Sequence, residues 1–217
     1  MLLYHLRTLL MLAVMLLALV QYLRTAAPRP PGIKLLGLLT AIALVVEVGG
    51  YLTTLRLWNN SVLYNVFITT EFCILLQALE RQLPRLRKTF RAIGLLGIAA
   101  LAAVLIGRRG DLWSALLSEN IALFALLLAV AAALALWHVA NTSSVPVQRV
   151  PLFWIGMGLL LYFGALSPVV ILAQVVRSAD PLMAAMLWTI MPVLCALRYL
   201  LTTYGFHLQA TTQHPLR

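Results

Sequence analysis

Long apolar stretches alternate with short polar breaks along nearly the whole chain. Seven stretches approach the length of about 20 mostly apolar residues that a helix needs to cross a bilayer. The predicted helices cover residues 5–24, 32–55, 61–80, 91–107, 117–139, 151–176 and 182–205. The breaks between them, such as residues 108–111, are rich in residues that favour turns. The pattern predicts an all-α polytopic bundle of seven transmembrane helices, forming a single integral membrane domain over residues 1–217.

Composition supports this class and excludes several others. Hydrophobic residues make up 63% of the chain and charged residues 10%, so no stretch is polar enough for a separate soluble domain. The formal net charge of +10 would suggest nucleic acid in a soluble protein, but here the basic residues cluster between apolar runs, where anionic lipid is the expected partner. Cys73 and Cys195 lie inside predicted helices and no histidine has metal-ligand spacing, so neither metal nor cofactor is predicted.

Basic residues are distributed unevenly between the two sides of the predicted domain. Ten lie in the first, third and fifth loops and the tail: Arg24, Arg29, Lys34, Arg81, Arg85, Arg87, Lys88, Arg91, Arg149 and Arg217. Five lie on the other side: Arg7, Arg56, Arg108, Arg109 and Arg177. Because Lys and Arg are retained in the cytoplasm, the N-terminus is predicted outside and the C-terminus inside the cell. The first apolar stretch lacks a small-x-small cleavage pattern and is interpreted as a mature helix.

Three ionisable residues lie deep inside predicted helices: Glu47, Glu71 and Arg198. A charge at the bilayer centre costs on the order of 2.5–3.5 kcal/mol, so such residues usually face a partner, a cavity or a pathway. Glu47 and Glu71 stand equally far from the turn at Asn59, which predicts the same depth for both, near mid-bilayer. We therefore interpret these three residues as a ligand or proton site.

Polar and aromatic residues accompany these charges at helical spacing, so that the second, third and seventh helices each present one polar face. The side chains predicted to line the site are Tyr51, Tyr64, Asn65, Trp188 and Tyr199. Pro168 and Pro192 lie inside the sixth and seventh predicted helices, where proline frees backbone carbonyls and permits kinks.

Two carboxylates and one guanidinium in a dry layer leave one negative charge uncompensated. Either one glutamate is protonated or a cationic species binds, and a proton-linked site is the natural hypothesis. The purely structural alternative is an interhelical ion pair that fixes packing. In that alternative the second glutamate is neutral and hydrogen-bonded to Tyr51, Tyr64 or a backbone carbonyl.

Helices five to seven can be laid over helices one to three, which pairs residues 66–73 with residues 187–195 and predicts a three-plus-one-plus-three repeat. In this layout alone the chain resembles SWEET-type sugar transporters and PQ-loop proteins, although it contains no Pro-Gln dipeptide. Residues 58–72, with Asn60, Tyr64, Asn65 and Glu71, resemble a segment of small uncharacterised bacterial seven-helix proteins. That resemblance implies a multi-pass protein of the bacterial inner membrane.

Neither a paired Asp motif nor a nucleophile with its base can be recognised in the sequence, so the chain is not predicted to be an enzyme. Our hypothesis from the sequence is a protein that binds a small molecule or ion at the buried Glu/Arg site and translocates it across the membrane. The alternative is a membrane sensor or assembly module that signals through a partner protein. A homo-oligomer is compatible with either hypothesis.

Overall fold

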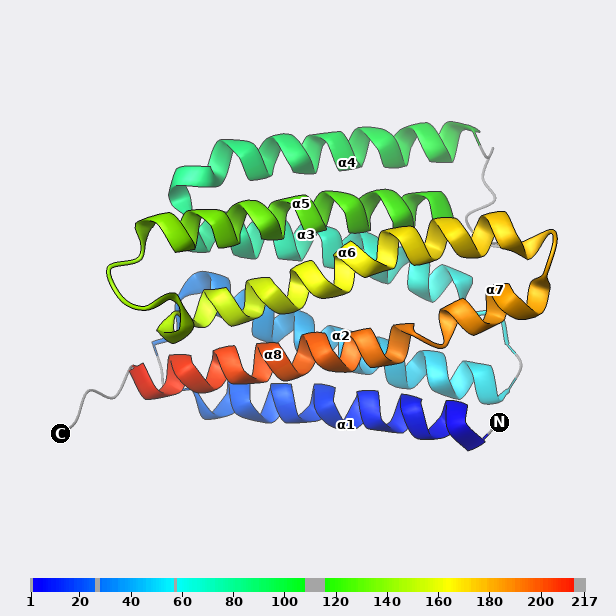
Figure 1. Cartoon of the computed structure of the whole chain (residues 1–217), viewed down its shortest axis with the longest axis horizontal. Helices are drawn as coiled ribbons and strands as arrows, with labels where there is room; N and C mark the ends of the chain where they lie inside the picture. The colour runs from blue at the N-terminus through cyan, green and yellow to red at the C-terminus, as the bar shows by residue number, and fades with distance from the viewer. Residues whose placement is uncertain (1, 26–27, 57, 108–115, 213–217) are drawn as a thin grey trace.

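The computed structural model describes residues 2–25, 28–56, 58–107 and 116–212. The predicted turn at residues 108–111 and the basic residue Arg217 lie outside this part of the chain. All regular secondary structure in the described part is helical (Figure 1): α1 (Leu2–Arg24), α2 (Pro31–Leu55), α3 (Ser61–Gln82), η1 (Pro84–Leu86), α4 (Arg87–Gly107), α5 (Ser118–Thr142), η3 (Val147–Arg149), α6 (Pro151–Arg177), α7 (Pro181–Trp188) and α8 (Met191–Thr212).

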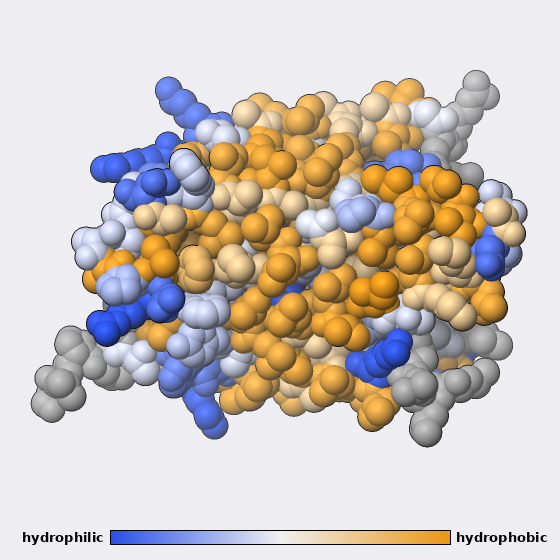
Figure 2. All heavy atoms as spheres, in the orientation of Figure 1, coloured by the Kyte–Doolittle hydropathy of each residue, from blue (hydrophilic) through white to orange (hydrophobic). Residues whose placement is uncertain are grey.

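Seven helical spans are long and apolar enough to cross a membrane, with α7 and α8 together forming the seventh. Apolar side chains cover the middle of the bundle, and hydrophilic side chains gather toward its two ends (Figure 2). The prediction of an all-α, multi-pass membrane protein is therefore confirmed by helix length and hydropathy. The orientation in the membrane and the internal repeat stay predictions.

Proline fixes where several helices begin. Pro31, Pro151 and Pro181 are the first residues of α2, α6 and α7. Proline suits this position because its fixed φ is already helical and its missing N–H has no helical acceptor there. At α7 the Asp180 side chain also accepts a hydrogen bond from the Met183 backbone N–H over 2.9 Å, which caps the helix. Proline therefore marks where these short polar loops end and the next helices begin.

Six of the seven spans form a closed ring. In order of contact the ring runs α1, α2, α3, α5, α6 and α8, and α8 packs against α1 to close it. Helix α4 lies outside, against α3 and α5, at the upper edge of the view in Figure 1. Its Gly97 leaves room for the stacked rings of Phe72 and Phe124, whose centroids lie 4.2 Å apart. The interior of the bundle is therefore bounded by the ring alone.

The seventh span differs from the predicted continuous helix over residues 182–205. Helix α7 ends at Trp188 and α8 begins at Met191, so the span is broken at Thr189 and Ile190. Pro192 explains the break, because it has no backbone N–H to donate and its ring would collide with the carbonyl of Trp188 in a continuous helix. Pro168, by contrast, remains inside an unbroken α6.

A side chain of α1 contacts the backbone at this break. The Arg7 side chain donates from Nη1 to the Thr189 carbonyl oxygen over 3.4 Å. Interrupted helices are tolerated within membranes where the freed backbone groups are satisfied or line a cavity. The break in the seventh span therefore coincides with a contact that closes the ring.

Candidate functional site

A cavity of about 360 Å³ lies inside the ring, in the half that contains the start of α1 and the α2–α3 turn. All the helices of the ring, together with α7, contribute to its wall, whereas no described residue of α4 does. Its volume is at the lower end of the range for small-molecule sites, roughly 300–1,000 Å³. The wall is mostly apolar, with a few convergent polar groups, as is typical of such sites.

The cavity reaches from the end of the bundle to its middle. Thr54, Asn60 and Ser61 line it beside the α2–α3 turn, and Glu71 lines it deeper along α3. Ten helical residues separate Ser61 from Glu71, which corresponds to about 15 Å, or half the thickness of the hydrocarbon core. The partly exposed side chain of Trp188 also belongs to the wall, so the cavity extends to the protein surface at this end.

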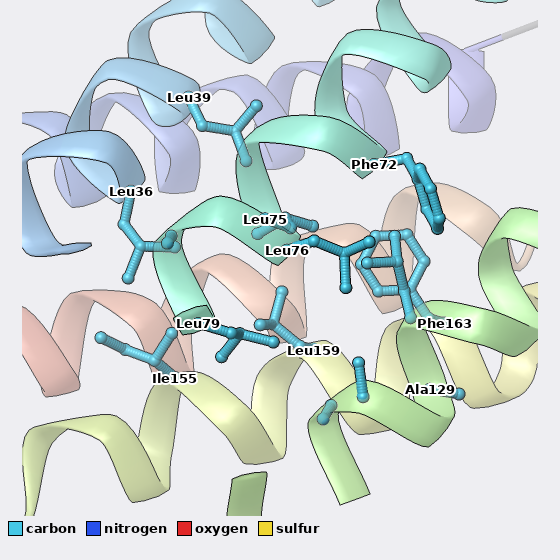
Figure 3. Packing of buried hydrophobic residues seen from close by; sticks show 14 of the residues in the cluster. Leu36, Leu39, Phe72, Leu75, Leu76, Leu79, Ala129, Ile155, Leu159 and Phe163 are labelled. Atoms are coloured by element: carbon cyan, nitrogen blue, oxygen red, sulfur yellow. The ribbon is translucent and has the colours of Figure 1, made fainter. Parts of the chain in front are cut away.

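A layer of buried aliphatic side chains lies beyond the cavity, toward the C-terminal end of the bundle, and does not line it. Leu39 on α2, Leu75 and Leu79 on α3, and Ile155 and Leu159 on α6 are each at most 3% exposed. Figure 3 shows these side chains pointing toward one another from helices on different sides of the ring. We call these five residues the apolar layer. It lies between the cavity and the C-terminal end of the bundle.

Glu71 and Arg198 form an ion pair between the cavity and the apolar layer. Arg198 Nη1 lies 2.7 Å from Glu71 Oε1, and the two side chains are 5% and 6% exposed. The contact joins opposite charges at the short distance typical of a guanidinium–carboxylate pair. Glu71 is therefore the buried carboxylate that Arg198 faces.

Aromatic rings surround the guanidinium group of Arg198. The centroids of Tyr162, Phe163 and Tyr199 lie 5.1, 5.0 and 5.1 Å from its central carbon. At these distances the electron-rich ring faces attract a cation, and the attraction is stronger where water is excluded. The positive charge is therefore stabilised by one carboxylate and three rings.

Close contact between α6 and α8 holds Arg198 at this position. A Cβ atom at Gly158 would lie 2.8 Å from the Arg198 carbonyl oxygen and 3.3 Å from its Cα. Glycine is required here because only a residue without a side chain lets the two backbones approach so closely.

Glu47 occupies the cavity wall without a cationic partner. Tyr64 donates a hydrogen bond from Oη to Glu47 Oε2 over 3.1 Å, and within the described residues Glu47 makes no ion pair. Gly50 makes this contact possible, because a Cβ atom there would collide with the Tyr64 hydroxyl. The Glu47–Tyr64 and Glu71–Arg198 contacts match the purely structural alternative in their pairing, but that alternative does not include a cavity reaching both carboxylates.

The structure brings most of the predicted site residues together. Glu47, Glu71, Tyr51, Tyr64 and Trp188 line the cavity. Arg198 and Tyr199 instead line a much smaller cavity of about 10 Å³ between α2, α3, α6 and α8.

Asn65 is buried outside the cavity wall. Its Oδ1 accepts a hydrogen bond from the Leu117 backbone N–H over 3.0 Å, at the start of α5. Asn65 therefore joins α3 to α5, rather than facing the cavity.

The sequence did not reveal the contributions of α1 and α6. His5 Nδ1 lies 3.2 Å from Tyr51 Oη, and Tyr162 and Phe163 complete the ring environment of Arg198. Helix α6 is apolar on all sides, so its periodicity does not indicate which face points inward.

Replacing Asn65 with leucine is expected to lower the free energy of unfolding by about 1–3 kcal/mol, because the buried Leu117 N–H loses its acceptor. Thermal unfolding in detergent measures the effect. The matched control is Asn141→Leu, since Asn141 is exposed and water can replace its hydrogen bond. Equal melting temperatures for both variants would contradict the assignment.

A scan against protein-family models and searches of curated proteins and solved structures gave no match.

Proposed function

We propose that this protein binds a small solute in the cavity and translocates it across the membrane by opening the cavity to one side at a time. The observation that carries the proposal is the position of the cavity, which extends about halfway through the bundle and ends above the apolar layer. Transporters place their substrate sites near the middle of the membrane, often beside an interrupted helix. The break between α7 and α8 borders this cavity through Trp188 and Met191.

Proton linkage is part of the proposal. Glu47 and Glu71 both line the cavity, and Arg198 pairs with Glu71. Ionised Glu47 would then be a carboxylate in a mostly apolar wall without a neutralising partner, which is costly. We infer that Glu47 holds a proton when the cavity contains no solute and releases it during the transport cycle.

Cysteine accessibility tests the alternating opening even while the solute is unidentified. In a chain with Cys73→Ala and Cys195→Ala, Ile68→Cys places one thiol in the cavity wall. We expect the membrane-impermeant reagent 2-(trimethylammonium)ethyl methanethiosulfonate to label this thiol in both right-side-out and inside-out vesicles. Each opening exposes the cavity to a different side, so both vesicle orientations should react.

The control is Val66→Cys, two residues away on α3, whose side chain is 62% exposed on the apolar surface and does not line the cavity. We expect no labelling of this thiol from either side. Labelling of Ile68→Cys from one side alone would contradict translocation and favour the sensor hypothesis, which requires a one-sided cavity. Absence of labelling from both sides would overturn the binding site itself.

A further inference from the structure

The charged groups of the cavity wall are all acidic. Among the described residues that line it, Glu47 and Glu71 carry carboxyl groups, and none is Lys, Arg or His. Arg198 neutralises Glu71 from behind the wall, at 2.7 Å. The remaining carboxylate is Glu47, which accepts a hydrogen bond from the neutral Tyr64 hydroxyl. When Glu47 is ionised, the cavity therefore favours a single positive charge.

The remainder of the wall suits an organic cation better than a metal ion. Metal ions require several oxygen, nitrogen or sulfur ligands at once. The described residues contain no group of three His, Cys, Asp or Glu side chains that could hold a metal ion. The wall instead carries aromatic rings, including Tyr51, Tyr64, Phe67 and Trp188. Rings of this kind bind ammonium groups through their electron-rich faces.

Arg198 shows that this chemistry already operates in the protein. Its guanidinium group is an organic cation held by the Glu71 carboxylate and by the rings of Tyr162, Phe163 and Tyr199. In the same way, Glu47 and the aromatic residues of the cavity provide a carboxylate and a set of aromatic rings. In the described structure, however, no side-chain cation is paired with Glu47.

We propose that the solute is a small organic cation, whose ammonium group pairs with Glu47 and whose apolar body lies against the aromatic wall. This inference rests on the proposed function, because it assigns a substrate class to the same cavity. A volume of about 360 Å³ accommodates an amine with one aromatic ring. The positive charge of the solute takes the place of the proton on Glu47, so uptake of one releases the other.

Three probes with the same phenylethyl body separate charge from shape: phenethyltrimethylammonium, 2-phenylethanol and 3-phenylpropionate. Dissociation constants are measured for the full chain in lipid nanodiscs. We expect the cation to bind at least about tenfold more tightly than the alcohol, because a charge-assisted contact outside water exceeds a neutral one. The anion should bind more weakly than both.

Two variants locate the origin of this preference. Glu47→Gln is expected to weaken binding of the cation by at least about tenfold and to leave binding of the alcohol nearly unchanged. The control is Glu119→Gln, which removes one negative charge at the same end of the bundle from an exposed side chain outside the cavity wall. It should leave all three dissociation constants unchanged.

The outcomes separate this inference from the proposed function. Equal affinity for the cation and the alcohol, or an unchanged preference in Glu47→Gln, would overturn the substrate class while the cavity remains a binding site. Displacement of the cation by sodium ions at equal concentration would also overturn it, in favour of an inorganic cation. If no probe binds and Ile68→Cys is also inert to the thiol reagent, the proposed function fails as well.

Discussion

Replacing Arg198 with leucine is expected to lower the free energy of unfolding by about 3–5 kcal/mol, the range for removing one partner of a buried ion pair. The large effect arises because Glu71 is 6% exposed and would be left as a carboxylate in an apolar environment. The three rings around the guanidinium would also lose their cation. Thermal unfolding of the purified protein in one detergent at fixed pH measures the change.

Three further variants make the comparison specific. Glu71→Gln should be tolerated better than Arg198→Leu, because the amide can still accept hydrogen bonds from the guanidinium. Adding Glu71→Leu to Arg198→Leu should restore much of the lost stability, since neither charge then remains buried. The control Arg177→Leu changes an exposed arginine at the end of α6 and should have little effect. Equal destabilisation by Glu71→Gln and Arg198→Leu would contradict the proposed pairing.

Replacing Gly158 with valine is expected to destabilise the protein although every charged residue stays in place. A Cβ atom at Gly158 would lie 2.8 Å from the Arg198 carbonyl oxygen, and backbone cannot move away as a flexible side chain can. Overpacking of this kind costs about 1–3 kcal/mol or more. The change would also separate α8 from α6 at the level of the Glu71–Arg198 pair, so loss of probe binding should accompany the lower melting temperature.

Gly164 provides the control on the same helix, because a Cβ atom there meets no atom within 4 Å. We expect Gly164→Val to leave the melting temperature and probe binding close to those of the unmodified chain. Similar losses in both variants would show that valine disturbs α6 itself, rather than its contact with α8. Gly158→Ala should show a smaller effect in the same direction as Gly158→Val.

Hydropathy and turn residues were sufficient to predict most of the helices, because a span must satisfy its backbone internally and match the thickness of the membrane. The predicted sixth helix, residues 151–176, agrees with α6 (Pro151–Arg177), since Pro151 marks its start. The prediction of a continuous seventh helix was wrong. A proline was expected to kink it, but the break extends over Thr189 and Ile190, where Arg7 binds a freed carbonyl.

The candidate site was predicted in part. Helical spacing placed Glu47, Glu71, Tyr51 and Tyr64 on inward faces, and all four line the cavity. Spacing along one helix cannot show which residues meet across a ring, so the choice of Glu71 as the partner of Arg198 required the structure. The same limitation applies to Gly158, whose importance lies entirely in its distance from the backbone of another helix.

The late position of α8 in the chain has a consequence for biosynthesis. Helix α3 is made before α8, so Glu71 enters the membrane before the guanidinium that neutralises it has been synthesised. Contact between α1 and α8 closes the ring, so the interior is also open to lipid until then. A nascent chain arrested before α8 would carry an unpaired carboxylate within the bilayer, a feature by which membrane quality-control proteases could distinguish it from the finished protein.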